Sequence, residues 1–195
     1  MQMILFLIVT ALWIYIYSIL YRAKLSAWKF IWGSIGFFTI SMIWLKDYIT
    51  PYAINSITVI SGIIGNCTGL FKILYTNSAI AINSEVNNIL LQIDVECSGI
   101  IEILVFISIM LFFEVYTKLQ RCILCIVGTL YLIFANAFRV TLISIAIYYK
   151  GYSVYNIMHS WIGRIIFYFL SIILYFYMFT KPQIKAMKVG DFKYE

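Results

Sequence analysis

The chain has 195 residues, of which 64% are hydrophobic and only 11% charged, and its mean hydropathy is +0.96. Soluble domains carry about 25% charged residues, so this composition excludes a soluble globular protein and indicates an integral membrane protein. The net charge of +6 does not indicate a nucleic-acid partner, because the basic residues stand at the ends of apolar runs, where they orient membrane proteins. No linker or repeat divides the chain, so we expect one membrane-embedded domain over residues 1–195.

Long apolar runs predict helices that cross the bilayer. They cover about residues 3–20, 30–45, 98–116, 122–148 and 158–179. We interpret the first run as a retained span, because it lacks the basic n-region and the small-residue cleavage site of a signal peptide. The predicted fold class is an all-α polytopic membrane bundle of about five full spans.

Residues 47–97 connect the second and third predicted spans and differ in composition from both. Glycine and asparagine interrupt the run from 52 to 72, which predicts a helix that lies in the outer interface or dips into it. Residues 73–95 are rich in β-formers at 80–82 and 89–95, with asparagines between them. This pattern predicts a small extracytoplasmic β-hairpin.

The basic residues predict the topology. Nine of the fourteen Lys and Arg residues fall in three connecting or terminal segments, namely 22–29, 118–121 and 181–193. Placing these segments in the cytoplasm gives five crossings with the N-terminus outside. Cys97 and the loop at 149–155 then share the outer side, whereas a sixth crossing at 52–72 would separate them.

With this topology, three chemically distinctive side chains meet near the outer surface. Cys97 stands at the outer end of the third span, and His159 stands at the outer end of the fifth. Arg139 lies inside the fourth span, roughly 15 Å below its outer end. The long side chain of an arginine can reach up from that depth.

This trio of residue types is typical of catalysis by a cysteine nucleophile. A helix N-terminus with a nearby cation lowers the pKa of a thiol. Histidine ordinarily titrates near neutral pH, and His159 is the only histidine in the chain. A guanidinium inside an apolar run is costly unless it is paired, so Arg139 is a functional candidate. Its expected role is to stabilise the oxyanion that forms when Cys97 attacks a carbonyl.

Small and polar neighbours are expected to support these three residues. Ser98 can cap the helix that follows Cys97, and Gly99 leaves backbone room for an incoming peptide. Gly163, one turn after His159, opens space on the same helix face.

Two polar residues are expected to act on Arg139. Asn136, one turn earlier, could orient the guanidinium. Glu102 is a potential ion-pair partner for Arg139 or Arg164, and that pair would give the arginine a structural role beside or in place of a catalytic one. Glu114 is expected to pair with Lys118.

The four cysteines do not predict a metal site or a cofactor. Cys122 and Cys125 have C-x-x-C spacing, but they open an apolar run, where buried thiols are the commoner interpretation. We expect neither a metal nor a cofactor.

Three short motifs resemble those of the exosortase/archaeosortase family of membrane-embedded cysteine transpeptidases. They are Glu96–Gly99, Asn136–Arg139 and His159–Gly163, which correspond to the C-S-G, N-x-x-R and H-x-x-x-G motifs of the family, in the family's order. The resemblance covers about residues 97–179 and is strongest to the short forms of Gram-positive bacteria.

The resemblance implies a function and a partner. Cys97 would be the nucleophile, His159 the acid and base, and Arg139 the group that stabilises the transition state or a substrate carboxylate. Substrates would be exported proteins that end in a short motif, a transmembrane helix and a basic tail, within the lipids of a bacterial plasma membrane. The enzyme would cleave at the outer membrane face and pass the acyl group to an acceptor.

Two other interpretations use the same residues. In the first, the protein is a cysteine protease with water as the acceptor. In the second, it is a non-enzymatic membrane subunit of a secretion or polysaccharide-export system, and Arg139 is only a structural ion pair. A transporter is disfavoured, because the sequence has no paired broken helices and no inverted repeat.

Overall fold

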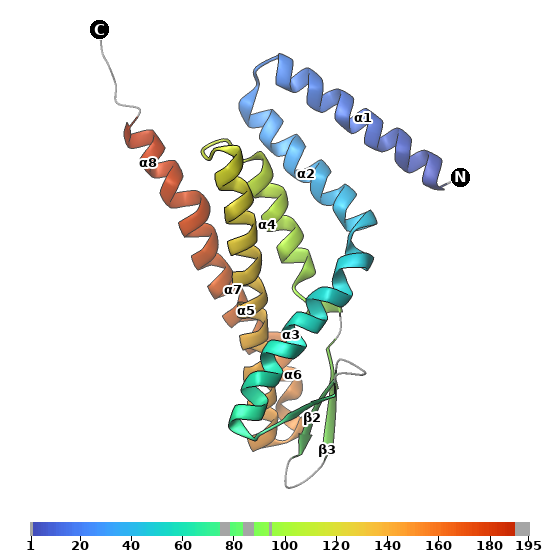
Figure 1. The fold of residues 1–195 in the computed structure, drawn as a ribbon, viewed down its shortest axis with the longest axis vertical. Coiled ribbons are helices and arrows are strands. Elements are labelled where there is room, and N and C mark those ends of the chain that lie inside the picture. Colours follow the sequence, from blue (N-terminus) through green and yellow to red (C-terminus); the bar gives the residue numbers. More distant parts are fainter. Residues whose placement is uncertain (1, 75–78, 84–87, 94, 190–195) are drawn as a thin grey trace.

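The structure, a computed structural model, describes residues 2–74, 79–83, 88–93 and 95–189. Its elements in chain order are α1 (Gln2–Arg22), α2 (Ser26–Trp44), α3 (Lys46–Thr68), β1 (Lys72–Leu74), β2 (Ala79–Asn83), β3 (Asn88–Gln92), η2 (Val95–Cys97), α4 (Ile100–Phe112), α5 (Lys118–Lys150), η3 (Tyr152–Val154), α6 (Tyr155–Ile157), η4 (Met158–Ile162), α7 (Gly163–Tyr175), η5 (Phe176–Thr180) and α8 (Lys181–Val189). The helices form an elongated bundle with a small sheet at one end (Figure 1).

Two helical stretches of the described chain are each long and apolar enough to cross a membrane, namely Lys118–Lys150 and Tyr152–Lys185. α2 and α3 are long and apolar enough only when they are taken together as one bent pair. α4 and the segment Phe6–Arg22 of α1 are shorter apolar helices. The prediction of a mainly helical, multi-pass membrane protein with a small sheet is therefore confirmed. The count of five full spans stays a prediction.

α5 begins at Lys118, earlier than the predicted start near residue 122. Local hydrogen bonds explain this difference. The Thr117 hydroxyl accepts the backbone N–H of Gln120 at 3.4 Å, and the Gln120 side chain accepts the N–H of Thr117 at 3.0 Å. This capping box satisfies two backbone donors that a helix start would otherwise leave unpaired. It therefore begins the helix at Lys118.

The predicted loop at 149–155 is also shorter in the structure. Gly151 has a φ of +75°, and its N–H bonds the carbonyl of Ile147 at 2.8 Å. Helical backbone resumes at once with Tyr152. A single glycine with a positive φ, a conformation that other residues rarely adopt, thus allows the chain to reverse between α5 and the C-terminal helices.

A sharp bend separates α2 from α3. The two helices meet at 80° around Leu45, where polar residues replace the apolar run of α2. α3 ends at Gly69, whose φ of +71° forms a left-handed C-cap. The helix expected within residues 52–72 is therefore present, and its position in the membrane interface stays a prediction.

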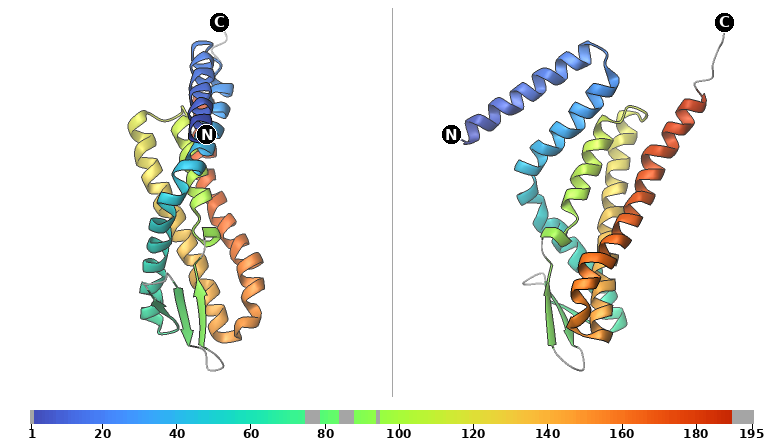
Figure 2. Two further views of the ribbon diagram at one scale, coloured as in Figure 1. Left: turned by 90° about the vertical axis from the view of Figure 1, so that its right-hand side faces the viewer. Right: turned by 180° about the vertical axis from the view of Figure 1, so that it is seen from behind.

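The sheet is antiparallel in the order β1-β2-β3. β2 and β3 correspond to the two strands of the predicted hairpin, with Ile80 opposite Leu91. β1 was not predicted, because a strand of three residues is too short to show a periodicity. The turns at 75–78 and 84–87 lie outside the described residues. Figure 2 shows the sheet beside the neighbouring ends of α3 and α5, which contact β1 and β2, respectively.

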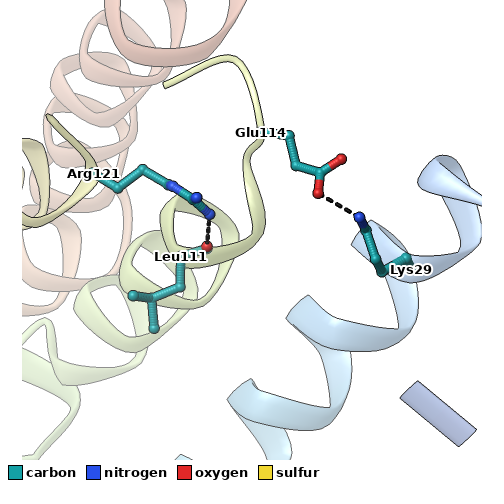
Figure 3. A network of polar contacts seen from close by, with 4 residues as sticks. All are labelled: Lys29, Leu111, Glu114 and Arg121. Atoms are coloured by element: carbon teal, nitrogen blue, oxygen red, sulfur yellow. Dashed lines mark hydrogen bonds and ion pairs between the residues drawn. The ribbon is translucent and has the colours of Figure 1, made fainter. Parts of the chain in front are cut away.

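The connections between α1 and α2 and between α4 and α5 lie at one end of the bundle with α8, and the sheet lies at the other (Figure 1). At the first end, Lys29 forms an ion pair with Glu114, and Arg121 donates a hydrogen bond to the Leu111 carbonyl at 2.6 Å (Figure 3). The predicted pairing of Glu114 with Lys118 is wrong, because α2 places Lys29 against Glu114 instead. The basic segments 22–29 and 118–121 and the described part of the third, residues 181–189, therefore share one end of the molecule.

A buried core lies at the sheet end of the bundle. It contains Ile57 of α3, Ile80 of β2, Ile143 of α5 and Cys97 itself. The outward faces of the two longest helical stretches instead carry exposed apolar side chains, including Ile126, Phe134, Ile165, Phe169 and Ile172. Such faces suit contact with lipid tails, where an exposed apolar side chain is at no disadvantage.

Candidate active site

Cys97 ends a short 3₁₀ turn that leads into α4. Cys97 is only 8% exposed, and its thiol is not part of a disulfide. Two residues later, Gly99 adopts a left-handed conformation with a φ of +63°, and α4 begins at Ile100. The sulfur therefore lies just before a helix N-terminus, where backbone N–H groups favour negative charge.

Ser98 bonds within the turn that carries the thiol. Its buried hydroxyl donates to the Val95 carbonyl at 2.6 Å and accepts the N–H of Ile100 at 3.3 Å. The residue directly before the helix is Gly99, but Ser98 still satisfies one of the free N–H groups of the first turn.

His159 contacts the thiol directly. The His159 Nε2 atom is 2.8 Å from the Cys97 Sγ atom. The histidine lies in the π-helical turn η4, in which the wider backbone spacing changes where a side chain points. Such turns within helices are frequent at functional sites. Both residues thus reach the site from short irregular turns rather than from regular helix.

Two tyrosines support the imidazole, and the sequence analysis did not identify them. The ring of Tyr155 stacks on that of His159, with centroids 5.2 Å apart and planes 23° apart. Tyr152 stacks on Tyr155 in turn, at 5.3 Å and 11°. Tyr155 lies four residues before His159, the spacing at which helical side chains meet. That spacing was the available signal, and the loop predicted at 149–155 concealed it.

Arg139 belongs to α5 and lies beside His159. It is 5% exposed, and its Nη2 atom donates to the His159 backbone carbonyl at 3.4 Å. Its Nε atom is buried, and no described residue forms a hydrogen bond with it. A buried guanidinium with an unused donor is costly unless a further acceptor arrives, and a substrate oxygen would be such an acceptor.

Asn136 contacts the turn that carries Cys97 and not the guanidinium that it was expected to orient. Its Nδ2 atom donates a hydrogen bond to the backbone carbonyl of Cys97. The contact ties α5 to the turn before α4, so it sets the position of the thiol relative to that helix. The motif indicated Asn136 as a supporting residue, but its partner depends on packing between distant segments.

The two glycines of the motifs make room for these contacts. A Cβ atom on Gly99 would lie 3.1 Å from Nδ2 of Asn136. A Cβ atom on Gly163 would lie 2.7 Å from the Met158 carbonyl oxygen and 3.3 Å from Cγ of Arg139. Because Gly163 has no side chain, the aliphatic part of the Arg139 side chain can pass close to the helical stretch that carries His159. This agrees with the open space that was expected at Gly163.

Alanine at Gly99 is expected to lower the free energy of unfolding by about 2 kcal/mol, because the left-handed backbone and the contact with Asn136 both penalise a Cβ atom. Gly69→Ala is the matched control, since Gly69 also adopts the left-handed conformation, with a φ of +71°, and has no neighbouring atom of the described chain within 4 Å of the added Cβ. It should cost only the conformational part, about 1 kcal/mol. Thermal unfolding in detergent measures both values. Equal losses at the two positions would contradict the steric role of Asn136.

Glu102 is not bonded as expected. It lines a cavity of about 330 Å³ together with Arg139 and Arg164. Within the part of the chain that the structure describes, Glu102 forms no ion pair, so the predicted pair with Arg139 is not present. The side chains of Glu102 and Arg139 line the same cavity but form neither a hydrogen bond nor an ion pair with each other.

No metal centre accompanies these side chains in the described ranges. Nowhere in them do three or more His, Cys, Asp or Glu residues form a group that could hold a metal ion.

These features define a multi-pass membrane protein in which a buried thiol and an imidazole meet at one end of a helical bundle. A family model described as transmembrane exosortase matches residues 1–177. The chain therefore belongs to the transmembrane exosortase family, as the three motifs predicted. No curated protein and no solved structure matches the chain.

Proposed function

We propose that this chain is a cysteine transpeptidase or peptidase that cleaves the C-terminal sorting signals of exported proteins. Membership of the transmembrane exosortase family supports a membrane sorting role. The observation that carries the chemical assignment is the distance of 2.8 Å between Cys97 Sγ and His159 Nε2. A non-enzymatic subunit would not require this contact, whereas a nucleophile and its base do.

The proposed reaction has two stages. His159 removes the thiol proton, and the sulfur of Cys97 attacks the scissile carbonyl to form a carbon–sulfur bond. The carbon–nitrogen bond then breaks, and the leaving amine takes its proton from His159. In the second stage an acceptor amine, or water, attacks the thioester, passes its proton to His159 and releases the thiol.

Arg139 is proposed to stabilise the oxyanion of each stage. Its buried Nε donor has no hydrogen-bond partner among the residues that the structure describes, and its position against the backbone of His159 puts it beside the proposed base. A preorganised cation near the developing charge is typically the largest single contribution to such a reaction.

We propose that the site faces the extracytoplasmic side of a bacterial plasma membrane. The basic segments 22–29, 118–121 and, as far as it is described, 181–189 lie at the opposite end of the bundle from the sheet, and such segments favour the cytoplasm. A substrate anchored by its own helix would then present its scissile bond near the membrane surface. Lateral packing with the bundle would reduce the entropic cost of alignment.

The direct test is to co-express the protein with a candidate substrate that ends in a short motif, a span and a basic tail. We expect cleavage of the signal and a covalent enzyme–substrate adduct that hydroxylamine releases, as a thioester requires. Analysis of the released product then separates transfer to an amine from hydrolysis. A substrate that is cleaved without any adduct at Cys97 would contradict the proposal.

Arg139→Lys is expected to lower processing by about 100-fold, because an ammonium keeps the charge but loses the planar fork of donors. Arg121→Lys is a matched control on the same helix, since Arg121 also donates to a backbone carbonyl but at the opposite end of the bundle. Its processing should equal that of the wild type. The readout is the cleaved fraction of substrate per inserted enzyme. Equal activity of the two variants would remove Arg139 from the mechanism.

A further inference from the structure

A small cavity adjoins both the Cys97 thiol and the His159 ring. Its volume is about 30 Å³. A cavity of about 150 Å³ accepts a benzene ring, so this one has room for a methyl group but not for a ring or a branched side chain.

The walls of this cavity are mainly apolar, and one side of it is firmly packed. That side is formed by Ile80 of β2 and Ile143 of α5, which are 1% and 4% exposed, together with the buried Val140 and Ile93. All four belong to the buried core at the sheet end of the bundle. The rest of the lining includes Leu91, Gln92, Ser144 and Tyr155. Well-packed cores resist the insertion of additional methylene groups, so the cavity cannot widen freely on the side of the two isoleucines.

The cavity lies where one particular substrate side chain must go. In a thioester at Cys97, the α-carbon on the acyl side is two covalent bonds from the sulfur, whereas the α-carbon of the leaving residue is three bonds away before cleavage. The acyl-side residue is therefore the one whose side chain starts closest to Sγ. A cavity lined by Cys97 itself is the nearest apolar space for that side chain.

We propose that this cavity holds the side chain of the residue on the acyl side of the scissile bond, and that it selects glycine or alanine against leucine and aromatic residues. This inference rests on the proposed function and adds a specificity to it. Ile143 and Ile80 are the residues that set the size limit. An extra methylene in such a pocket typically changes specificity by about 10-fold or more.

Peptidyl vinyl sulfones test the proposal without knowledge of the natural substrate. The thiol adds across the vinyl double bond, so that sulfur bonds to the carbon next to the last residue and the thiol proton ends on the carbon beside the sulfone. Four probes with glycine, alanine, leucine or phenylalanine as the last residue would be incubated with the full-length protein in detergent. Mass spectrometry gives the rate of adduct formation at Cys97, and Cys97→Ser identifies labelling at the other cysteines.

We expect the alanine probe to react at least about 30-fold faster than the leucine probe in the wild type. Ile143→Ala should reduce this ratio by about 10-fold by enlarging the cavity. Ile147→Ala is the matched control, because Ile147 is buried in the same core on the same helix but does not line the cavity. It should leave the ratio unchanged. Ile143→Val removes less of the side chain and should lower the ratio by a smaller factor. It provides the test if the Ile143→Ala protein fails to accumulate.

The outcomes separate the two proposals. Equal rates for the alanine and leucine probes at Cys97, or an unchanged ratio in Ile143→Ala and Ile143→Val, would overturn the size selection and leave the proposed function intact. If no probe reacts at Cys97 while iodoacetamide does, the thiol is accessible but binds no peptide, and both proposals fail.

Discussion

Replacing Cys97 by serine is expected to abolish cleavage of a co-expressed sorting substrate, with a loss of about 10⁴-fold or more. Serine has nearly the same size, so the buried core around residue 97 should stay packed and the protein should still insert. The hydroxyl is far less acidic than a thiol, so a neighbouring imidazole that suffices for Cys97 does not produce an effective oxygen nucleophile. The measurement is the cleaved fraction of substrate, normalised to the amount of enzyme in the membrane.

The other cysteines provide controls within the same chain. Cys125 is a half-buried free cysteine on α5, and Cys67 and Cys122 are exposed. Serine at any of these three positions should leave processing at the wild-type level. If Cys97→Ser also retained full processing, the thiol would have no chemical role, and the non-enzymatic subunit would become the better interpretation.

The meeting of Cys97 and His159 could be anticipated from the sequence for a simple physical reason. In a membrane protein, the lipid fixes the depth of each apolar run, and the flanking lysines and arginines determine which end of the run is which. Residues at matching ends of different spans therefore lie at one level even when many residues separate them in the chain. This inference requires no knowledge of helix packing, and the motifs then predict the chemistry.

Features that depend on packing between elements were not predictable in this way. The bond from Asn136 to the Cys97 carbonyl requires the rotation of α5 relative to the turn before α4. The π turn that carries His159 has no pattern in hydropathy, because it inserts one residue into an otherwise regular helix. The cavity beside the thiol is formed jointly by β2, β3 and α5, so neither its size nor its walls can be read from any single segment.

The small sheet has a clearer purpose once these contacts are known. β2 contributes Ile80 and Ile82 to the same buried core as Cys97. The turn that carries the thiol is therefore fixed on one side by the sheet and on the other by Asn136 of α5. A nucleophile must keep its alignment with its base to within a fraction of an ångström. In the proposed mechanism, this double attachment gives the strands directly before Cys97 a role, which is to hold the thiol in line with His159.

Removing the imidazole is expected to reduce processing nearly as much as removing the thiol. His159→Ala should cost about 10³-fold or more, because no other histidine can serve as the base. The substitution also removes the ring that stacks on Tyr155, so a loss of activity alone would not distinguish proton transfer from support of the turn. A second variant is needed to separate these two roles.

His159→Phe provides that separation. Phenylalanine keeps a planar ring of similar size against Tyr155 but has no nitrogen to accept the thiol proton, so it should be as inactive as His159→Ala while preserving the thermal stability of the wild type. Added imidazole should partly restore processing in His159→Ala, where the deleted side chain leaves space beside Sγ, and should have no effect in His159→Phe, where the ring occupies that space. Substantial activity in His159→Phe would mean that His159 only supports the fold, and that another group accepts the proton from Cys97.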